Sequence, residues 1–233
     1  MNAPFTYLML VVALVSPLDA LSDGLLSAHM LQHVILIAVG PPLLALGRPE
    51  IACFRGLPAQ VRRGLARSPA WRALGNLFAA ASRPLPATLM HGVALWLWHA
   101  PVLFEAAATS DVLHWLEHLF FFGTALLFWR GLVKAGRSPA KAVVGMAAAL
   151  MTLVHGGFLS ALITLSPAVL YPTASRGAAL WGLSPLDDQQ LAGVIMWVPA
   201  GAAYLAAGLL LAARLLVAQP PASQMLPKWP RPA

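Results

Sequence analysis

Residues 142–165 read AVVGMAAALMTLVHGGFLSALITL, a run of 24 residues with no Asp, Glu, Lys or Arg. A helix needs about 20 apolar residues to cross the hydrocarbon core of a bilayer. The run does not alternate between apolar and polar residues, as a barrel strand would. It therefore predicts a transmembrane helix. The whole chain has this character, since 59% of its 233 residues are hydrophobic and only 10% are charged.

Other apolar runs of similar length lie on both sides of this one. They predict an all-α, polytopic transmembrane helix bundle of about six spans, forming one unit over residues 1–218 with no soluble domain. Residues 1–20 could instead be a cleaved signal peptide, although no Lys or Arg precedes their apolar run. The proline-rich tail, 219–233, is expected to be disordered. The expected spans are 4–20, 25–46, 85–106, 112–132, 142–165 and 191–217.

The net charge of +7 is unevenly distributed along the chain. Fourteen of the fifteen Lys and Arg residues lie in 48–83, in 130–141 or from Arg214 onward, whereas seven of the eight acids lie elsewhere. This is the positive-inside pattern, which reports topology rather than a nucleic-acid partner. We expect the C-terminus and the basic segment 48–83 to be cytoplasmic. That segment is expected to form one or two short helices on the anionic inner leaflet, or a solvated basic loop.

Six of the seven histidines are predicted to lie in the outer half of the bundle. Their expected depths are about 6–15 Å from the outer boundary at 1.5 Å per residue, with His114 shallower. Ionisable groups within a membrane are costly and commonly functional, and imidazole is a frequent ligand of copper, zinc and iron. The six are His29, His33, His99, His114, His118 and His155.

Two of these histidines open the second span, and two more open the fourth. His29 and His33 are four residues apart, so they share one helix face. His114, Glu117 and His118 repeat this geometry with a carboxylate added. As H-x-x-E-H the second group also matches a zinc-protease pattern, but no third ligand follows at a recognisable spacing. Each pair could instead be polar groups satisfied by neighbouring helices.

The remaining histidines have other surroundings. His99 precedes Pro101, which interrupts the helix hydrogen bonds, and His155 precedes two glycines that permit close helix packing. His91 lies deeper and is expected to be structural, hydrogen-bonded to a neighbouring helix. Among the methionines only Met30 and Met196 are placed to assist a metal, and core packing explains them as well.

Two further local patterns bear on the site. Cys53 is the single cysteine, so a metal must be held by imidazole, carboxylate or thioether. Ser184, Pro185 and Asp187 form a good helix start, and the neighbouring acids and amides could also attract cations.

Several blocks of sequence together resemble the multi-spanning CtaG-like cytochrome c oxidase assembly factors. They run from about residue 16 to residue 211 and read S-A-H-M-x-Q-H, G-P-P-L-L-x-L-G-R-P, H-G-x-x-x-W-x-W-H-x-P-x-x-F, H-x-x-E-H and D-D-Q-Q-L-A-G-x-x-M-W-V-P. This resemblance implies a bacterial inner-membrane protein needed to make haem–copper oxidases, through delivery or insertion of copper. The family commonly has another N-terminal helix, so a seventh span is expected to be missing here. The residues carried over are His29, His33, His99, His114, Glu117, His118 and Asp188.

The leading hypothesis is a non-enzymatic assembly factor that holds copper and passes it to an oxidase subunit, with the bilayer and that subunit as its partners. No nucleic acid and no small-molecule substrate are expected. The expected metal ligands are His29, His33, His99, His114, Glu117, His118 and His155. Two alternatives remain open: a b-type haem electron carrier, and a metal-free structural partner of the oxidase.

Overall fold

The computed structural model describes residues 17–217, and all regular structure in that range is helical. Four helical segments are long and apolar enough to cross a membrane, and a bent pair brings the total to five. The expected number of about six spans is therefore not confirmed. The expected span at 4–20 lies mostly outside the described residues, as does the tail 219–233. Residues 17–20 belong to the short helix α2, Pro17–Ser22.

The spanning segments follow one another along the chain. The first is a compound helix, and the second is the bent pair. Their bounds are α3 Leu26–Val34, η1 Ile35–Val39 and α4 Gly40–Gly47; α8 Pro84–Trp98 and α9 Pro101–Ala107; α10 Asp111–Ala135; α11 Pro139–Leu165; and α12 Pro185–Val217.

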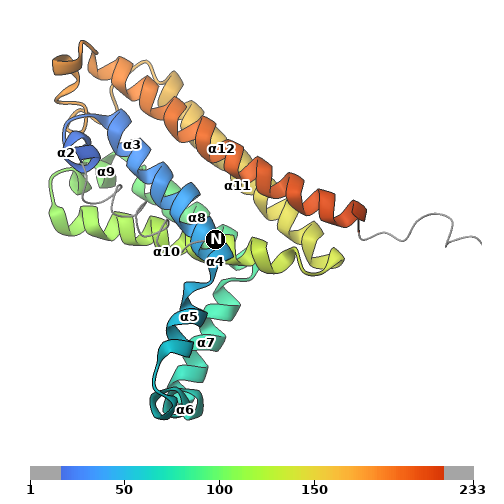
Figure 1. Cartoon of the computed structure of the whole chain (residues 1–233). Helices are drawn as coiled ribbons and strands as arrows, with labels where there is room; N and C mark the ends of the chain where they lie inside the picture. Colours follow the sequence, from blue (N-terminus) through green and yellow to red (C-terminus); the bar gives the residue numbers. More distant parts are fainter. Residues whose placement is uncertain (1–16, 218–233) are drawn as a thin grey trace, which may run out of the picture.

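Helices α11 and α12 run side by side in opposite directions, with α3 against α12 and with α8 against both α10 and α11 (Figure 1). Small residues allow the α11–α12 approach. A Cβ atom on Gly193 would lie 2.9 Å from the backbone nitrogen of Thr164 and 3.0 Å from the carbonyl oxygen of Ser160. A larger side chain at Gly193 would therefore push the two helices apart.

Charge divides the molecule into two ends. The end that we call the acidic end consists of α2, α9, the α9–α10 turn and residues 166–184. Its acids are Asp19, Asp23, Glu105 and Asp111, whereas residues 166–184 contain Arg176 and no acid. The basic end consists of the α10–α11 turn, the end of α12 and residues 48–83. Arg214 of α12 lies against Gly136 of the α10–α11 turn, where an added Cβ would approach its guanidinium. The connections that the sequence separates by charge are thus separated in space (Figure 1).

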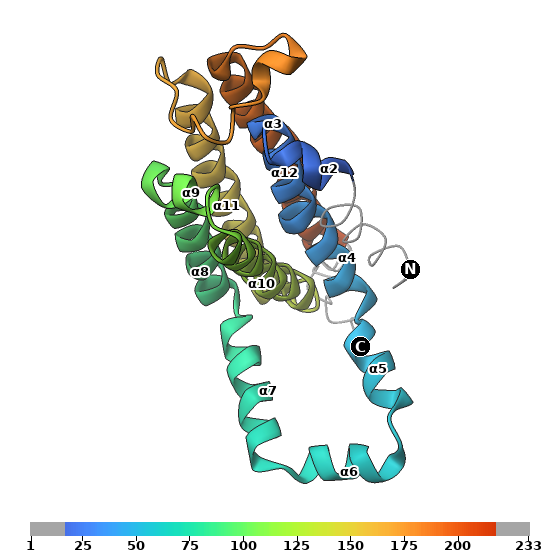
Figure 2. The ribbon, with the colours of Figure 1, turned by 90° about the vertical axis from the view of Figure 1, so that its left-hand side faces the viewer.

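The basic segment forms a U-shaped arm of three short helices, rather than one or two (Figure 2). Pro49, Pro58 and Pro69 stand at the helix starts and divide the segment. The arm is attached to the bundle by Arg130 of α10, whose Nη1 lies 2.6 Å from Glu50 Oε1 and whose guanidinium lies over the Phe78 ring. The three helices are α5 Pro49–Gly56, α6 Ala59–Arg67 and α7 Pro69–Ala81.

The expected span at 85–106 coincides with the bent pair α8 and α9, whose helix breaks at residues 99–100, next to Pro101, which was expected to interrupt the helix hydrogen bonds. Helices α8 and α9 meet there at an angle of 77°. Pro101 has no N–H to donate, and it forces Ala100 into an extended conformation. The break places His99 at the C-terminal end of α8, where its backbone carbonyl leaves the helical hydrogen-bond pattern.

A π-helical turn interrupts the first span at residues 35–39. Pro41 and Pro42 follow it and supply no N–H to the carbonyls of the preceding turn. The indole N–H of Trp129, on α10, donates to the freed carbonyl of Ile37 at 2.9 Å. The prolines therefore accompany a local change of helical pitch and leave the Ile37 carbonyl without a helical donor. This carbonyl is then available to the hydrogen bond that joins α10 to the first span.

Candidate metal centre

Helix α3 presents His29 and His33 on one buried face, and their ring centroids lie 4.2 Å apart. The start of α3 is held by Asp188 of α12. Its carboxylate accepts hydrogen bonds from the backbone N–H of Leu26, at 2.8 Å, and of Ser27, at 3.1 Å. A carboxylate at a helix N-terminus also interacts favourably with the helix dipole. Asp188 thus fixes the helix turn from which His29 and His33 project.

Helix α10 brings three more groups to the same place. His114 and His118 have ring centroids 4.2 Å apart, and the His114 ring stacks on the His29 ring at 5.2 Å. Glu117 is completely buried, with Oε2 at 3.7 Å from His29 Nε2 and 3.8 Å from His33 Nε2. Two helices that are distant in sequence thus share one buried polar cluster.

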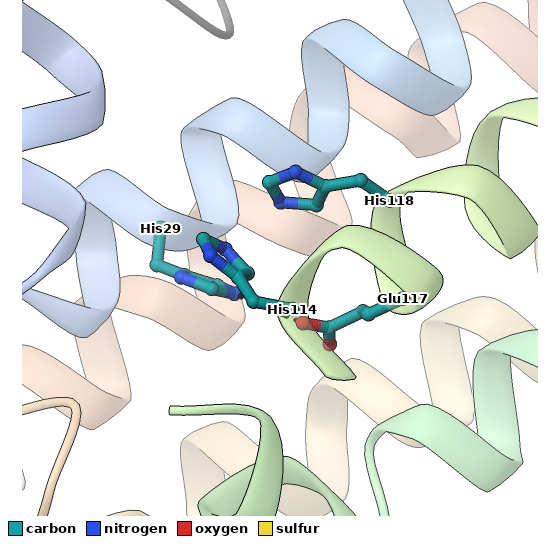
Figure 3. Close-up of side chains that lie close together, drawn as sticks. All are labelled: His29, His114, Glu117 and His118. Atoms are coloured by element: carbon teal, nitrogen blue, oxygen red, sulfur yellow. Dashed lines mark ion pairs between the residues drawn. The ribbon is translucent and has the colours of Figure 1, made fainter. Parts of the chain in front are cut away.

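Four of these residues could hold one ion. One ligand atom from each of His29, His114, Glu117 and His118 lies within 4.8 Å of all the others (Figure 3). Ligands bound about 2.0 Å from a metal lie at most about 4 Å from one another. Small rotations of the side chains would therefore bring the set to coordination distances. We call these four residues the outer group.

His99 lies beside the outer group at the α8–α9 break. Its Nδ1 is 2.8 Å from the Leu95 carbonyl, which can only accept, so Nδ1 carries the proton and Nε2 has a free lone pair. The His99 carbonyl accepts a hydrogen bond from the Tyr171 hydroxyl at 2.7 Å. Burial raises the pKa of this hydroxyl above its usual range, and the charge of Glu117 adds to the shift, so Tyr171 remains a donor.

The cluster contains an unusual number of buried polar atoms without hydrogen bonds. Within residues 17–217, no hydrogen-bond partner is found for either Glu117 carboxylate oxygen or for Nε2 of the five histidines of the cluster, and His155, outside the cluster, lacks one at both ring nitrogens. Leaving such atoms buried and unpaired is costly, whereas a metal ion would use their lone pairs. The five are His29, His33, His99, His114 and His118.

His155 and His91 lie outside this cluster. His155, on α11, faces Gly92 of α8, where an added Cβ would lie 3.4 Å from its Nε2. His91 is bonded through Nδ1 to Thr124 and through Nε2 to Tyr204, each at 3.1 Å. The structural role expected for His91 is confirmed. His155 is not brought to the outer group, although it was expected among the ligands.

The family model described as cytochrome c oxidase caa3 assembly factor matches residues 5–218. The chain belongs to this family. The matched range includes every histidine of the cluster and the helices that carry them. Membership in the assembly-factor family implies an oxidase partner and a membrane environment, and it favours a role other than catalysis. No curated protein and no solved structure matches the chain.

Residues 166–184 of this assembly factor fold over the cluster. Thr173 donates to the Glu105 carboxylate through its backbone N–H and its hydroxyl. The N–H of Gly177 donates to the Gly24 carbonyl at 2.8 Å, and a Cβ on Gly177 would lie 2.9 Å from that oxygen. Gln189 accepts from the Leu170 N–H at 2.6 Å. The segment thus connects α9, the start of α3 and the start of α12.

Several residues that shape the centre were not identified from the sequence as parts of it. Tyr171 is buried against Phe104, which also packs on His29. Asp188 matched the family pattern, but its bonds to α3 could not be read from α12. The expected helix start at Ser184 is confirmed by reciprocal hydrogen bonds with Asp187.

Proposed function

We propose that this assembly factor binds copper in the histidine cluster and delivers it to a subunit of a haem–copper cytochrome c oxidase. The observation that carries the proposal is the outer group, in which three imidazoles and one carboxylate converge from α3 and α10. The protein surrounds these groups with apolar and aromatic side chains yet leaves their lone pairs unpaired. A single bound cation would be coordinated by these lone pairs together.

The ligand chemistry is compatible with copper. Imidazole binds copper well, and affinity for divalent metals rises to a maximum at copper for a given ligand set. The single cysteine, Cys53, is exposed on α5 in the basic arm and does not belong to the cluster. A set of histidines and one carboxylate, without thiolate, suits a metal that must be released to a recipient.

The charge pattern supports an orientation for transfer. Basic connections favour the cytoplasmic side, so we place the basic end and the C-terminus in the cytoplasm of a bacterium, with the protein in its inner membrane. The outer group lies near the acidic end, because His29 and His114 each belong to the first turns of their helices. Copper would therefore be exchanged on the extracytoplasmic side.

The geometry favours a single ion over the haem alternative. A b-type haem needs two histidines on opposite faces of a wide, planar macrocycle. Here the His29, His114 and His118 rings pack directly on one another, with centroid separations from 4.2 to 6.2 Å. The scaffold alternative requires histidines bonded to neighbouring helices, as His91 is, and the cluster lacks such bonds among the described residues.

The test is the copper content of the purified full-length protein, with the His118→Ala and His155→Ala variants compared. We expect His118→Ala to lose at least half of the bound copper and to lower the copper content of the oxidase made in cells that carry it. His155→Ala removes an imidazole outside the cluster and is expected to retain the metal. Copper-free wild-type protein, or equal copper content in both variants, would contradict the proposal. An intense Soret band would support haem instead.

A further inference from the structure

A small, partly open space lies beside the outer group, deeper in the bundle. Its volume is about 30 Å³, and it is lined from α3, the end of α8, α11 and α12. A space of this size holds one water-sized particle. Three side chains with ligand atoms line it: His33, His99 and Met196. None of the three belongs to the outer group.

The two imidazoles have the separation that a shared ion requires. The His33 and His99 ring centroids are 5.9 Å apart. With a metal–nitrogen distance of about 2.0 Å, each ring centre lies about 3 Å from the metal, so opposed imidazoles have centroids about 6 Å apart. Both residues are almost completely buried, with exposed fractions of 2% and 3%.

Both rings have nitrogen available for coordination. His99 uses Nδ1 to bond the Leu95 carbonyl, which leaves the Nε2 lone pair free. His33 directs Nε2 toward Glu117, at 3.8 Å, and its Nδ1 has no hydrogen-bond partner among the described residues. The three hydroxyls of the space do not compete for these nitrogens, because Thr152 and Ser160 donate to carbonyls of their own helix and the Tyr204 hydroxyl is bonded to His91.

Met196 adds a different kind of ligand. It is a buried residue of α12 that lines the space together with the two imidazoles. A thioether is soft, and the combination of thioether with a small number of imidazoles selects monovalent copper over harder divalent ions. The outer group has a carboxylate and no sulfur, so it lacks this selectivity, although its three imidazoles can also bind Cu(I).

We propose that His33, His99 and Met196 form a second, inner copper site that takes Cu(I), separate from the outer group. The choice of copper rests on the proposed function, whereas the location rests on this small space and its three donors. His33 lies between the two sites, since it contacts Glu117 on one side and lines the inner space on the other. Each site binds the ion as supplied, and no electron transfer is involved.

The test is an anaerobic titration of the full-length protein with Cu(I), in competition with a chromophoric Cu(I) chelator, followed by X-ray absorption spectroscopy. Wild-type protein is expected to bind two equivalents and to show a sulfur scatterer at about 2.3 Å. Met196→Leu conserves side-chain volume and is expected to lose the sulfur signal and one equivalent. The matched control is Met30→Leu, because Met30 is buried in α3 but does not line the space. It should leave both measurements unchanged.

The possible outcomes separate this inference from the proposed function. One bound equivalent without sulfur, unchanged in Met196→Leu but lost in His118→Ala, would overturn the inner site and leave the proposed function intact. A sulfur signal lost in Met30→Leu, and not in Met196→Leu, would also overturn it. Wild-type protein that binds no copper would overturn both.

Discussion

At the scale of single residues, the centre depends on polar atoms whose partners lie on distant parts of the chain. Asp188 is completely buried and bonds two backbone N–H groups at the start of α3. Its neighbour Asp187 is exposed and, within residues 17–217, bonds only Ser184 in its own helix start. Adjacent carboxylates therefore have separate roles: Asp187 stabilises α12, and Asp188 positions His29 and His33.

Replacing Asp188 with Ala should lower stability and weaken copper binding together. Loss of hydrogen bonds to a charged, buried acceptor costs about 1.5–3 kcal/mol in free energy of unfolding, measured here by denaturation in detergent. The copper dissociation constant should rise at least tenfold, because the first turn of α3 is released. Asp187→Ala is the control: it removes an exposed carboxylate that bonds Ser184 at the start of α12, and it is expected to lower stability less than Asp188→Ala without changing copper affinity. Equal copper affinity in both variants would show that Asp188 does not position the site.

At the scale of elements, prolines decide where the spanning helices deviate from regular geometry. Pro101 ends α8 beneath His99, and Pro41 and Pro42 follow the π-helical turn that bonds to Trp129. The π-helical turn lies on the span that contributes His33, and the break at Pro101 lies on the span that contributes His99. A regular helix in either span would point these side chains in other directions.

Trp129→Phe tests the bond at the π-helical turn. It removes the indole donor to the Ile37 carbonyl, and no helical N–H replaces it because Pro41 and Pro42 follow. We expect a loss of about 1–3 kcal/mol in free energy of unfolding, the cost of a buried unpaired acceptor. Trp115 is an exposed indole on the same helix, and Trp115→Phe should change stability by less than about 0.5 kcal/mol. A Trp129→Phe protein as stable as the Trp115→Phe protein would contradict this account.

At the scale of the whole molecule, charge and ligands are arranged along one axis. The basic arm and Arg214 lie at one end, whereas the outer group lies toward the acidic end beneath residues 166–184. The proposed metal exchange and the basic residues that set the proposed orientation therefore lie at opposite ends of the bundle. The orientation can be measured independently of any metal.

Labelling of cysteines with a membrane-impermeant maleimide tests the orientation. Cys53 is exposed on the basic arm, so it should react in inverted membrane vesicles and remain unlabelled in intact cells. A Cys53→Ala, Leu180→Cys variant places the thiol at an 89% exposed position of the acidic end, and the pattern should reverse. Labelling of Cys53 from outside intact cells would show that the basic end is extracytoplasmic.

The sequence by itself determined the membrane class, the approximate location of the spans within the described residues and the separation of basic from acidic connections. Hydropathy and charge act locally, so a run such as 142–165 is sufficient. It also placed the break-forming Pro101 and the spacing of His29 with His33. It did not give the 77° bend or the number of spans, because a proline can kink a membrane helix or end it.

Only the tertiary structure decided which histidines meet. Convergence depends on the rotation of each helix about its axis, and that rotation is set by contacts between distant residues, such as Gly193 with Thr164 and Asp188 with Leu26. His118 and His155 were expected at similar depths, but they face different neighbours. His118 joins the outer group, whereas His155 faces Gly92. Depth follows from position in the chain, whereas direction follows from packing.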